Sequence, residues 1–187
     1  MTPKQLKDWN KAQAAKEGLP VRMIERNYML EQFLSKIAES KFKNNFVLKG
    51  GFLIGSKVGL SQRTTEDIDT TIKGFALSEE KLKDVLTEIL QEPTKDGVIF
   101  ELGRFKETRE TASYPGYQVR LVGKLENIKI PTKLDITAGD SMFPLEEKYS
   151  HKMMYSEDTM EIYAYQTEQI LAEKLHSVIT WGEDNSR

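Results

Sequence analysis

The chain has 187 residues, of which 39% are hydrophobic and 30% are charged, and its formal net charge is −2. This composition is typical of a globular domain and excludes a disordered chain, and no apolar run approaches the roughly 20 residues that span a bilayer. The absence of cysteine excludes disulfides, thiolate nucleophiles and cysteine zinc sites, and two histidines are too few for a multi-histidine metal site.

The N-terminal third of the chain is basic and helical. Residues 1–60 carry 11 lysines and arginines against 5 acidic residues, a balance that suits a phosphate backbone or, equally, the solvated face of an amphipathic helix. Residues 4–17 are predicted as a polar helix and 21–39 as an amphipathic one, so 1–44 are treated as an N-terminal helical segment. There is no apolar signal core, and we therefore expect a cytoplasmic protein with no membrane partner.

From residue 45 onward, strands and helices alternate before three strands follow one another. The predicted strands are 45–49, 67–73, 98–105, 117–125, 128–138 and, as a short strand or extended entry, 161–165. The predicted helices are 50–58, 78–91 with Ser78 as its cap, and 167–181. This order predicts an α+β (α/β) fold, with a mixed β-sheet whose last three strands form an antiparallel meander and with helices on one face.

Two aspartates share one face of the strand at 67–73. Asp67 and Asp69 are two residues apart, so their Cα atoms lie about 7 Å apart on the same side of the strand. Like charges this close repel unless a cation lies between them, and oxygen ligands favour Mg²⁺, Mn²⁺ or Ca²⁺, of which Mg²⁺ suits a site shared with phosphate. A solvated pair on an exposed strand face is the alternative, although aspartate is depleted in strands.

A third acid and a glycine pair point to the same site. Asp135 is the acid within the strand at 128–138, between two apolar residues, and Asp140 just beyond it is the reserve candidate. Gly50 and Gly51 end a strand and open a helix, where glycine lets the backbone approach a phosphate and the helix N-terminus offers free N–H groups. An ordinary strand-to-helix turn is the competing interpretation of that pair.

A lysine interrupts the apolar side of the last helix. Ile170, Leu171, Leu175, Val178 and Ile179 are predicted to form an arc that faces the core, with Lys174 inside that arc and Glu173 opposite, toward solvent. A lysine there either extends to the surface or reaches an anion in a cleft. We expect the second, because a nucleotide site is predicted nearby.

These motifs together resemble the AbiEii/AbiGii toxin family of nucleotidyltransferases. The resemblance rests on Lys49-Gly50-Gly51, then Arg63-Thr64-Thr65-Glu66-Asp67-Ile68-Asp69, then Leu171-Ala172-Glu173-Lys174-Leu175, and it covers roughly residues 25–187. The family belongs to the DNA polymerase β-like superfamily and acts in type IV toxin–antitoxin or abortive-infection systems, a form of phage defence. Residues 45–187 would then be its catalytic core.

The resemblance implies a role for each motif. Asp67 and Asp69 would bind Mg²⁺ (or Mn²⁺), and Asp135 would be a third metal ligand or the base for the acceptor hydroxyl. The nucleotide-binding positions would be Lys49, Gly50, Gly51, Thr65 and, on the triphosphate, Lys174. The substrate would be an NTP, the acceptor RNA (tRNA 3′ ends) or a protein, and a cognate antitoxin the partner.

Other functions stay open on the sequence alone. A small-molecule nucleotidyltransferase or a nucleotide-dependent kinase would use the same residues, and a non-catalytic nucleotide-binding domain would keep the fold. Relatives commonly continue into an Arg-x-Lys-Asp element and a C-terminal helical domain. Because this chain stops at Arg187, we expect it to lack that domain.

Overall fold

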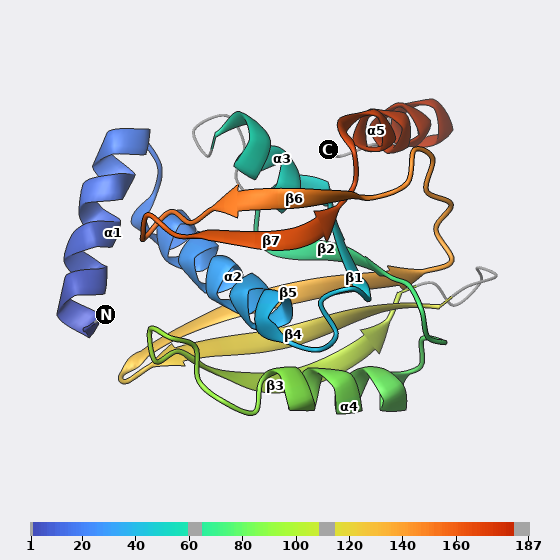
Figure 1. The fold of residues 1–187 in the computed structure, drawn as a ribbon. Helices are drawn as coiled ribbons and strands as arrows, with labels where there is room; N and C mark the ends of the chain where they lie inside the picture. Colours follow the sequence, from blue (N-terminus) through green and yellow to red (C-terminus); the bar gives the residue numbers. More distant parts are fainter. Residues whose placement is uncertain (1, 60–64, 109–114, 182–187) are drawn as a thin grey trace.

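The computed structural model describes residues 2–59, 65–108 and 115–181, which form five helices and a seven-stranded sheet (Figure 1). Arg63, Thr64 and Arg187 lie outside the described residues. The helices are α1 (Pro3–Glu17), α2 (Val21–Glu39), α3 (Gly50–Val58), α4 (Glu79–Ile89) and α5 (Thr167–Trp181). The strands are β1 (Phe46–Lys49), β2 (Asp67–Ile72), β3 (Ile99–Glu107), β4 (Gly116–Leu125), β5 (Ile128–Ala138), β6 (Glu147–Lys152) and β7 (Thr159–Ala164).

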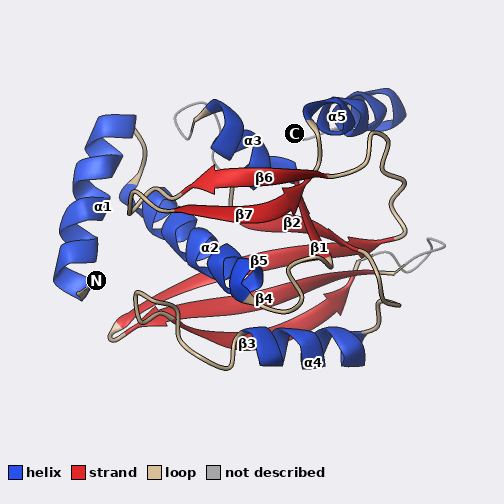
Figure 2. Ribbon diagram, in the orientation of Figure 1, coloured by secondary structure: helices blue, strands red, loops and turns tan. Residues whose placement is uncertain are grey.

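The strands form one mixed sheet in the order β3-β4-β5-β2-β1-β7-β6. β3, β4 and β5 make the antiparallel meander that the sequence predicts. β2 runs parallel to β5 and antiparallel to β1, while β1 runs parallel to β7 and β7 antiparallel to β6 (Figure 2). The predicted α+β class with a mixed sheet is therefore confirmed, and β2 and β1 lie at its centre.

One face of the sheet carries the hydrophobic core. Ile68 on β2 and Leu134 and Ile136 on β5 are fully buried, and α2 and α4 lie over this face (Figure 1). Burying each such side chain stabilises the fold by roughly 1.5–3 kcal/mol. α4 begins where the sequence predicts, because the Ser78 hydroxyl accepts the backbone N–H of Lys81. The alternate residues of β2 and β5 project to the other face.

Most predicted elements are confirmed, but the strand β6 was not predicted. Its inward positions are Tyr149 and His151, and the rest of the strand is charged or polar, so it lacks an alternation of apolar residues. Its pairing with β7 forms the strand. No helix in the described ranges combines the length and apolar character needed to cross a membrane.

The bounds of α5 are predicted correctly, but its orientation is not. Leu171, Leu175, Val178 and Ile179 are 58–82% exposed, and only Ile170 of the predicted arc is buried. Glu173, expected to face solvent, is half-buried, as is Lys174. Within the described residues, the side of α5 that faces the protein is thus its more polar side. Hydrogen bonds of Gln166 and Gln169 to the loop after β5 set this orientation.

Candidate active site

The three predicted aspartates lie on one face of two neighbouring strands. Asp69 on β2 and Asp135 on β5 are Cα partners across the parallel ladder, and Asp67 is the partner of Lys133. Residues paired in this way project to the same face, and adjacent strands are about 4.8 Å apart. The sequence predicts that these acids belong together, and the strand register brings them side by side.

The carboxylate of Asp69 is the most constrained of the three. Its Oδ2 accepts the backbone N–H of Gly51 at 3.3 Å. Burial, followed by the negative charges of Asp67 and Asp135, raises the pKa of Asp69 to about 6, against the opposing effects of the Gly51 N–H and Lys49. Asp69 is therefore repelled by Asp67 and Asp135 among half-buried side chains, which favours a cation among them.

Gly50 permits this approach between α3 and β2. Its φ is +69°, and a Cβ at this position would lie 1.9 Å from Oδ2 of Asp69. Any other residue would therefore displace the carboxylate as well as strain the backbone. α3 begins at Gly50, and the N–H groups of its first turn lie beside the carboxylates, where they suit a phosphate.

Thr65 contacts an aspartate. Its Oγ1 donates to the Oδ1 of Asp67 at 2.9 Å. The sequence predicts a nucleotide contact for this hydroxyl, and the structure shows it orienting the first carboxylate of β2.

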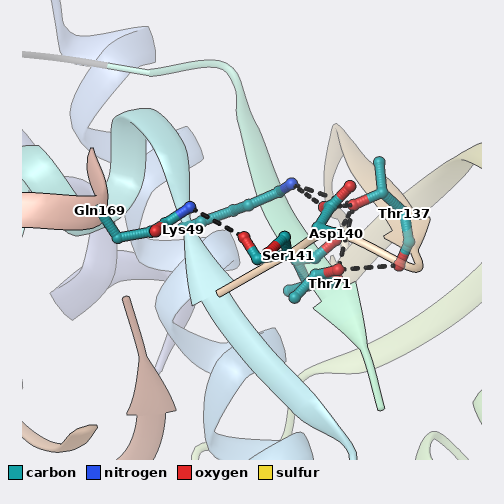
Figure 3. A network of polar contacts seen from close by, with 7 residues as sticks. Lys49, Thr71, Thr137, Asp140, Ser141 and Gln169 are labelled. Atoms are coloured by element: carbon teal, nitrogen blue, oxygen red, sulfur yellow. Dashed lines mark hydrogen bonds and ion pairs between the residues drawn. The ribbon is translucent and has the colours of Figure 1, made fainter. Parts of the chain in front are cut away.

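Lys49 lies in a polar network on the same face of the sheet. Its Nζ donates to Oγ1 of Thr137 at 3.0 Å and to Oδ2 of Asp140 at 2.5 Å, and the Thr137 hydroxyl also donates to Asp140 (Figure 3). The lysine and aspartate side chains are about one-tenth exposed. Asp140, the reserve acid, therefore balances the charge of Lys49.

A hollow of about 490 Å³ separates β1 from α5. Nε2 of Gln169 donates to the carbonyl of Ser141, and its Oε1 accepts from the N–H of Phe143, which fixes α5 against the loop after β5 (Figure 3). The hollow is lined by Lys49, Gln169, Ala172, Glu173, His176 and Ser177. Lys174 is half-buried and is absent from this lining, so the structure does not bring it to the hollow.

A buried chain of hydrogen bonds, here called the relay, anchors α3. The sequence does not predict it. Oγ of Ser56 lies 2.6 Å from Nδ1 of His151, whose Nε2 lies 2.8 Å from Oε1 of the fully buried Glu31. The relay joins α3 to β6 and α2, and so fixes the helix that begins at Gly50. The signal available in the sequence is slight: a histidine in a polar stretch and a glutamate in an otherwise apolar turn of α2.

The acidic side chains do not form a closed metal cage. Among the residues that the structure describes, no three histidine, aspartate or glutamate side chains are placed to enclose a metal ion. Mg²⁺ does not require such a cage, since it commonly binds one or two carboxylates together with substrate phosphates and water. Asp67, Asp69 and Asp135 provide the oxygen donors that such a partial site needs.

Comparisons with known proteins agree with the motifs. A family model described as "Nucleotidyl transferase AbiEii toxin, Type IV TA system" matches residues 32–187. A search of curated proteins finds no match.

A solved structure shares the fold at low sequence identity, and two others are similar in part. A crystal structure presented as a nucleotidyltransferase from H. pylori is 19% identical over 84% of this chain, with a TM-score of 0.51. JHP933 from Helicobacter pylori is 17% identical over 88% (TM-score 0.48), and an antigenic nucleotidyltransferase-like protein from Paracoccidioides brasiliensis is 14% identical over 85% (TM-score 0.49). This chain spans 59%, 60% and 69% of those chains.

Proposed function

The chain belongs to the AbiEii family of nucleotidyltransferase toxins of type IV toxin–antitoxin systems, and on that premise we propose that it transfers a nucleotide from an NTP to RNA with the help of Mg²⁺. The observation that carries the proposal is the row of carboxylates on β2 and β5 beside the Gly50–Gly51 turn. An acidic row next to a helix N-terminus suits a metal-bound triphosphate.

Asp67, Asp69 and Asp135 would hold the metal. Their fit rests on two features: a shared face in register, and the raised pKa of Asp69, which comes first from burial and then from the charges of Asp67 and Asp135. When bound, the metal neutralises charge on the phosphates and on the attacking and leaving oxygens. Asp135, on the β5 side of the row, is either a ligand or the base that takes the proton of the acceptor hydroxyl.

The nucleotide would lie on the α3 side of the row. The free N–H groups in the first turn of α3, which Gly50 and Gly51 open, would bind phosphate oxygens, and Thr65 would keep Asp67 oriented through their 2.9 Å hydrogen bond. Lys49 is paired with Asp140, and it is proposed as a nucleotide contact from the family motif. Lys174 is proposed as a triphosphate contact from the family motif alone.

The acceptor oxygen would attack the α-phosphorus of the NTP. Its bond to that phosphorus forms as the bond to the β-phosphate bridge oxygen breaks, the hydroxyl proton passes to a carboxylate, and pyrophosphate leaves. The N–H groups of α3 would hold the phosphates beside the row of acids and their metal, so the protein would act mainly by positioning and charge.

The biological setting follows from the family. We propose that the chain acts in the cytoplasm as the toxin half of a phage-defence pair and that a cognate antitoxin neutralises it. Growth arrest on expression of the wild type, absent with Asp69→Asn, supports this setting. Equal growth with both would contradict it.

Labelled nucleotides test the reaction. The chain is incubated with total RNA, Mg²⁺ and each NTP carrying ³²P in the α- or the γ-phosphate. Transfer of only the α-label to RNA, lost in Asp67→Asn and Asp69→Asn, is the expected result. Transfer of the γ-label would identify a kinase, and label on protein or a small molecule would identify another acceptor.

Binding without transfer has its own readout. Calorimetry with Mg²⁺ and a non-hydrolysable NTP is expected to show binding that weakens in Asp69→Asn. Binding with no transfer to any acceptor would overturn the enzymatic proposal in favour of a nucleotide-binding domain.

A further inference from the structure

Three cations lie beside the carboxylates on the same face of the sheet. Lys133 on β5 is the Cα partner of Asp67 on β2 and of Arg120 on β4. In the next row, Asp135 pairs with Gln118, which pairs with Lys106 on β3. Since directly paired residues project to one side, Lys106, Arg120 and Lys133 (the basic cluster) continue the carboxylate face outward across β5, β4 and β3.

This part of the sheet is open on the side of the basic cluster. Along β4 and β5, the residues on the core face are buried except for the half-buried Ile128, while those on the other face, apart from Gly116, are half-buried or exposed. Lys106 and Arg120 are exposed and Lys133 is half-buried. The helices α2 and α4 lie over the opposite face (Figure 1). A ligand can therefore reach all three cations and the carboxylates from one side.

Lys133 lies opposite Asp67, whereas Lys106 and Arg120 are not directly paired with an acid within the described part of the chain. There, none of Lys106, Arg120 and Lys133 forms an ion pair, whereas the acid on this face of β3, Glu101, pairs with Lys124. Arg120 and Lys133 are directly opposite each other, and like charges so placed destabilise a sheet. An anionic ligand on this face would offset that repulsion.

We propose that the basic cluster is the surface that binds the phosphate backbone of the RNA acceptor, and this rests on the function proposed above. The two substrates would then approach the acids from opposite sides. The nucleotide would lie on the α3 side of Asp69, and the acceptor would lie on the β4 side of Asp135. A single-stranded RNA whose backbone crosses β3 and β4 would bring its terminal hydroxyl to the acids. Phosphate contacts of this kind bind without sequence preference and weaken with salt.

RNA binding by matched variants tests the proposal. Anisotropy of a fluorescein-labelled 20-nucleotide single-stranded RNA is measured over a range of KCl for the wild type and for Arg120→Gln/Lys133→Gln. We expect at least about 10-fold weaker binding at low salt, and a log–log salt slope shallower by about 0.7 for each lost contact. The control Lys83→Gln/Lys95→Gln makes the same charge change on the opposite side and is expected to bind like wild type.

Two further readouts separate this role from a structural one. Arg120→Gln removes a like-charge contact, so its melting temperature should equal or exceed that of the wild type. In transfer assays, the double variant should raise the KM for RNA and leave the KM for NTP unchanged. A matching single-stranded DNA is expected to bind through the same cations.

The outcomes distinguish this proposal from the previous one. If Lys7→Gln/Lys11→Gln on α1 weakens RNA binding and the Arg120/Lys133 variant does not, α1 is the RNA surface and the basic cluster is not. Unchanged RNA binding in every variant also overturns the proposal. If RNA binds through the cluster but no nucleotide is transferred, the surface stands and the transferase proposal fails.

Discussion

In the strands β2 and β5 and in the helix α5, the sequence predicts one apolar face that packs against the core. Only in the strands is that predicted face buried. In β2 and β5, the apolar residues are buried and the aspartates share the other face. In α5, four of the five residues of the apolar arc are exposed, and the side holding Gln169 and Glu173 faces the protein.

The difference lies in what surrounds each element. A central strand is paired on both edges, so its two faces are decided together by its neighbours, and the alternation of β5 agrees with that of β2 and β4. A helix at the margin of a domain is oriented by the contacts it finds. For α5 these are the hydrogen bonds of Gln166 and Gln169 to the loop after β5.

The largest effect should come from the strand site. Asp69→Asn keeps the shape of the side chain and removes its charge, so we expect nucleotide transfer to fall by at least about 100-fold. Glu173→Gln makes the same chemical change on α5 and should alter the rate by less than about 3-fold. Both are measured as kcat/KM with α-labelled NTP. An equal loss in the two variants would mean that α5 contributes as much to the reaction as β2 does.

The close approach of Gly50 to Asp69 predicts the next effect. Gly50→Ala should lower transfer by about 100-fold, because even an ångström of displacement of a reacting group can cost that much. Gly18→Ala is a matched control: its φ is +67°, close to that of Gly50, and a Cβ there has no described neighbour within 4 Å.

Stability measurements complete that comparison. Both alanine variants should lose about 1–2 kcal/mol for the left-handed backbone, and Gly50→Ala more, because its Cβ meets a carboxylate. If Gly50→Ala loses no more activity than Gly18→Ala, the contact with Asp69 is not what the site requires of this glycine.

Local patterns predicted the acidic row, and long-range contacts supplied its geometry. That Asp67 and Asp69 share a face is predicted by the alternation of side chains along one strand. The pairing of Asp69 with Asp135, however, depends on the register between two strands about 60 residues apart in the sequence. The ion pair of Lys49 with Asp140 joins β1 to the end of β5, and no pattern within either segment indicates it. The unpredicted strand β6 likewise forms through its pairing with β7.

Two substitutions in α5 test its orientation. Ile170 is 7% exposed, and Ile170→Ala should lower the free energy of unfolding by about 2–4 kcal/mol. Leu175 is 62% exposed, and Leu175→Ala should change it by no more than about 0.5 kcal/mol. Urea midpoints measure both. Equal losses would show that the apolar arc is buried after all, as the sequence alone predicts.

The smallest effect should come from Thr65, which tests whether alternation alone orients the acids. Thr65→Val keeps the side-chain shape but removes the hydrogen bond to Asp67, whose net value is about 1 kcal/mol, so transfer should fall about 5-fold. Thr65→Ser keeps the hydroxyl and should restore most of the rate. If valine and serine behave alike, β2 orients Asp67 by its strand geometry alone. If only the valine variant is impaired, the Thr65 hydroxyl is needed to orient Asp67 in addition to the strand geometry of β2.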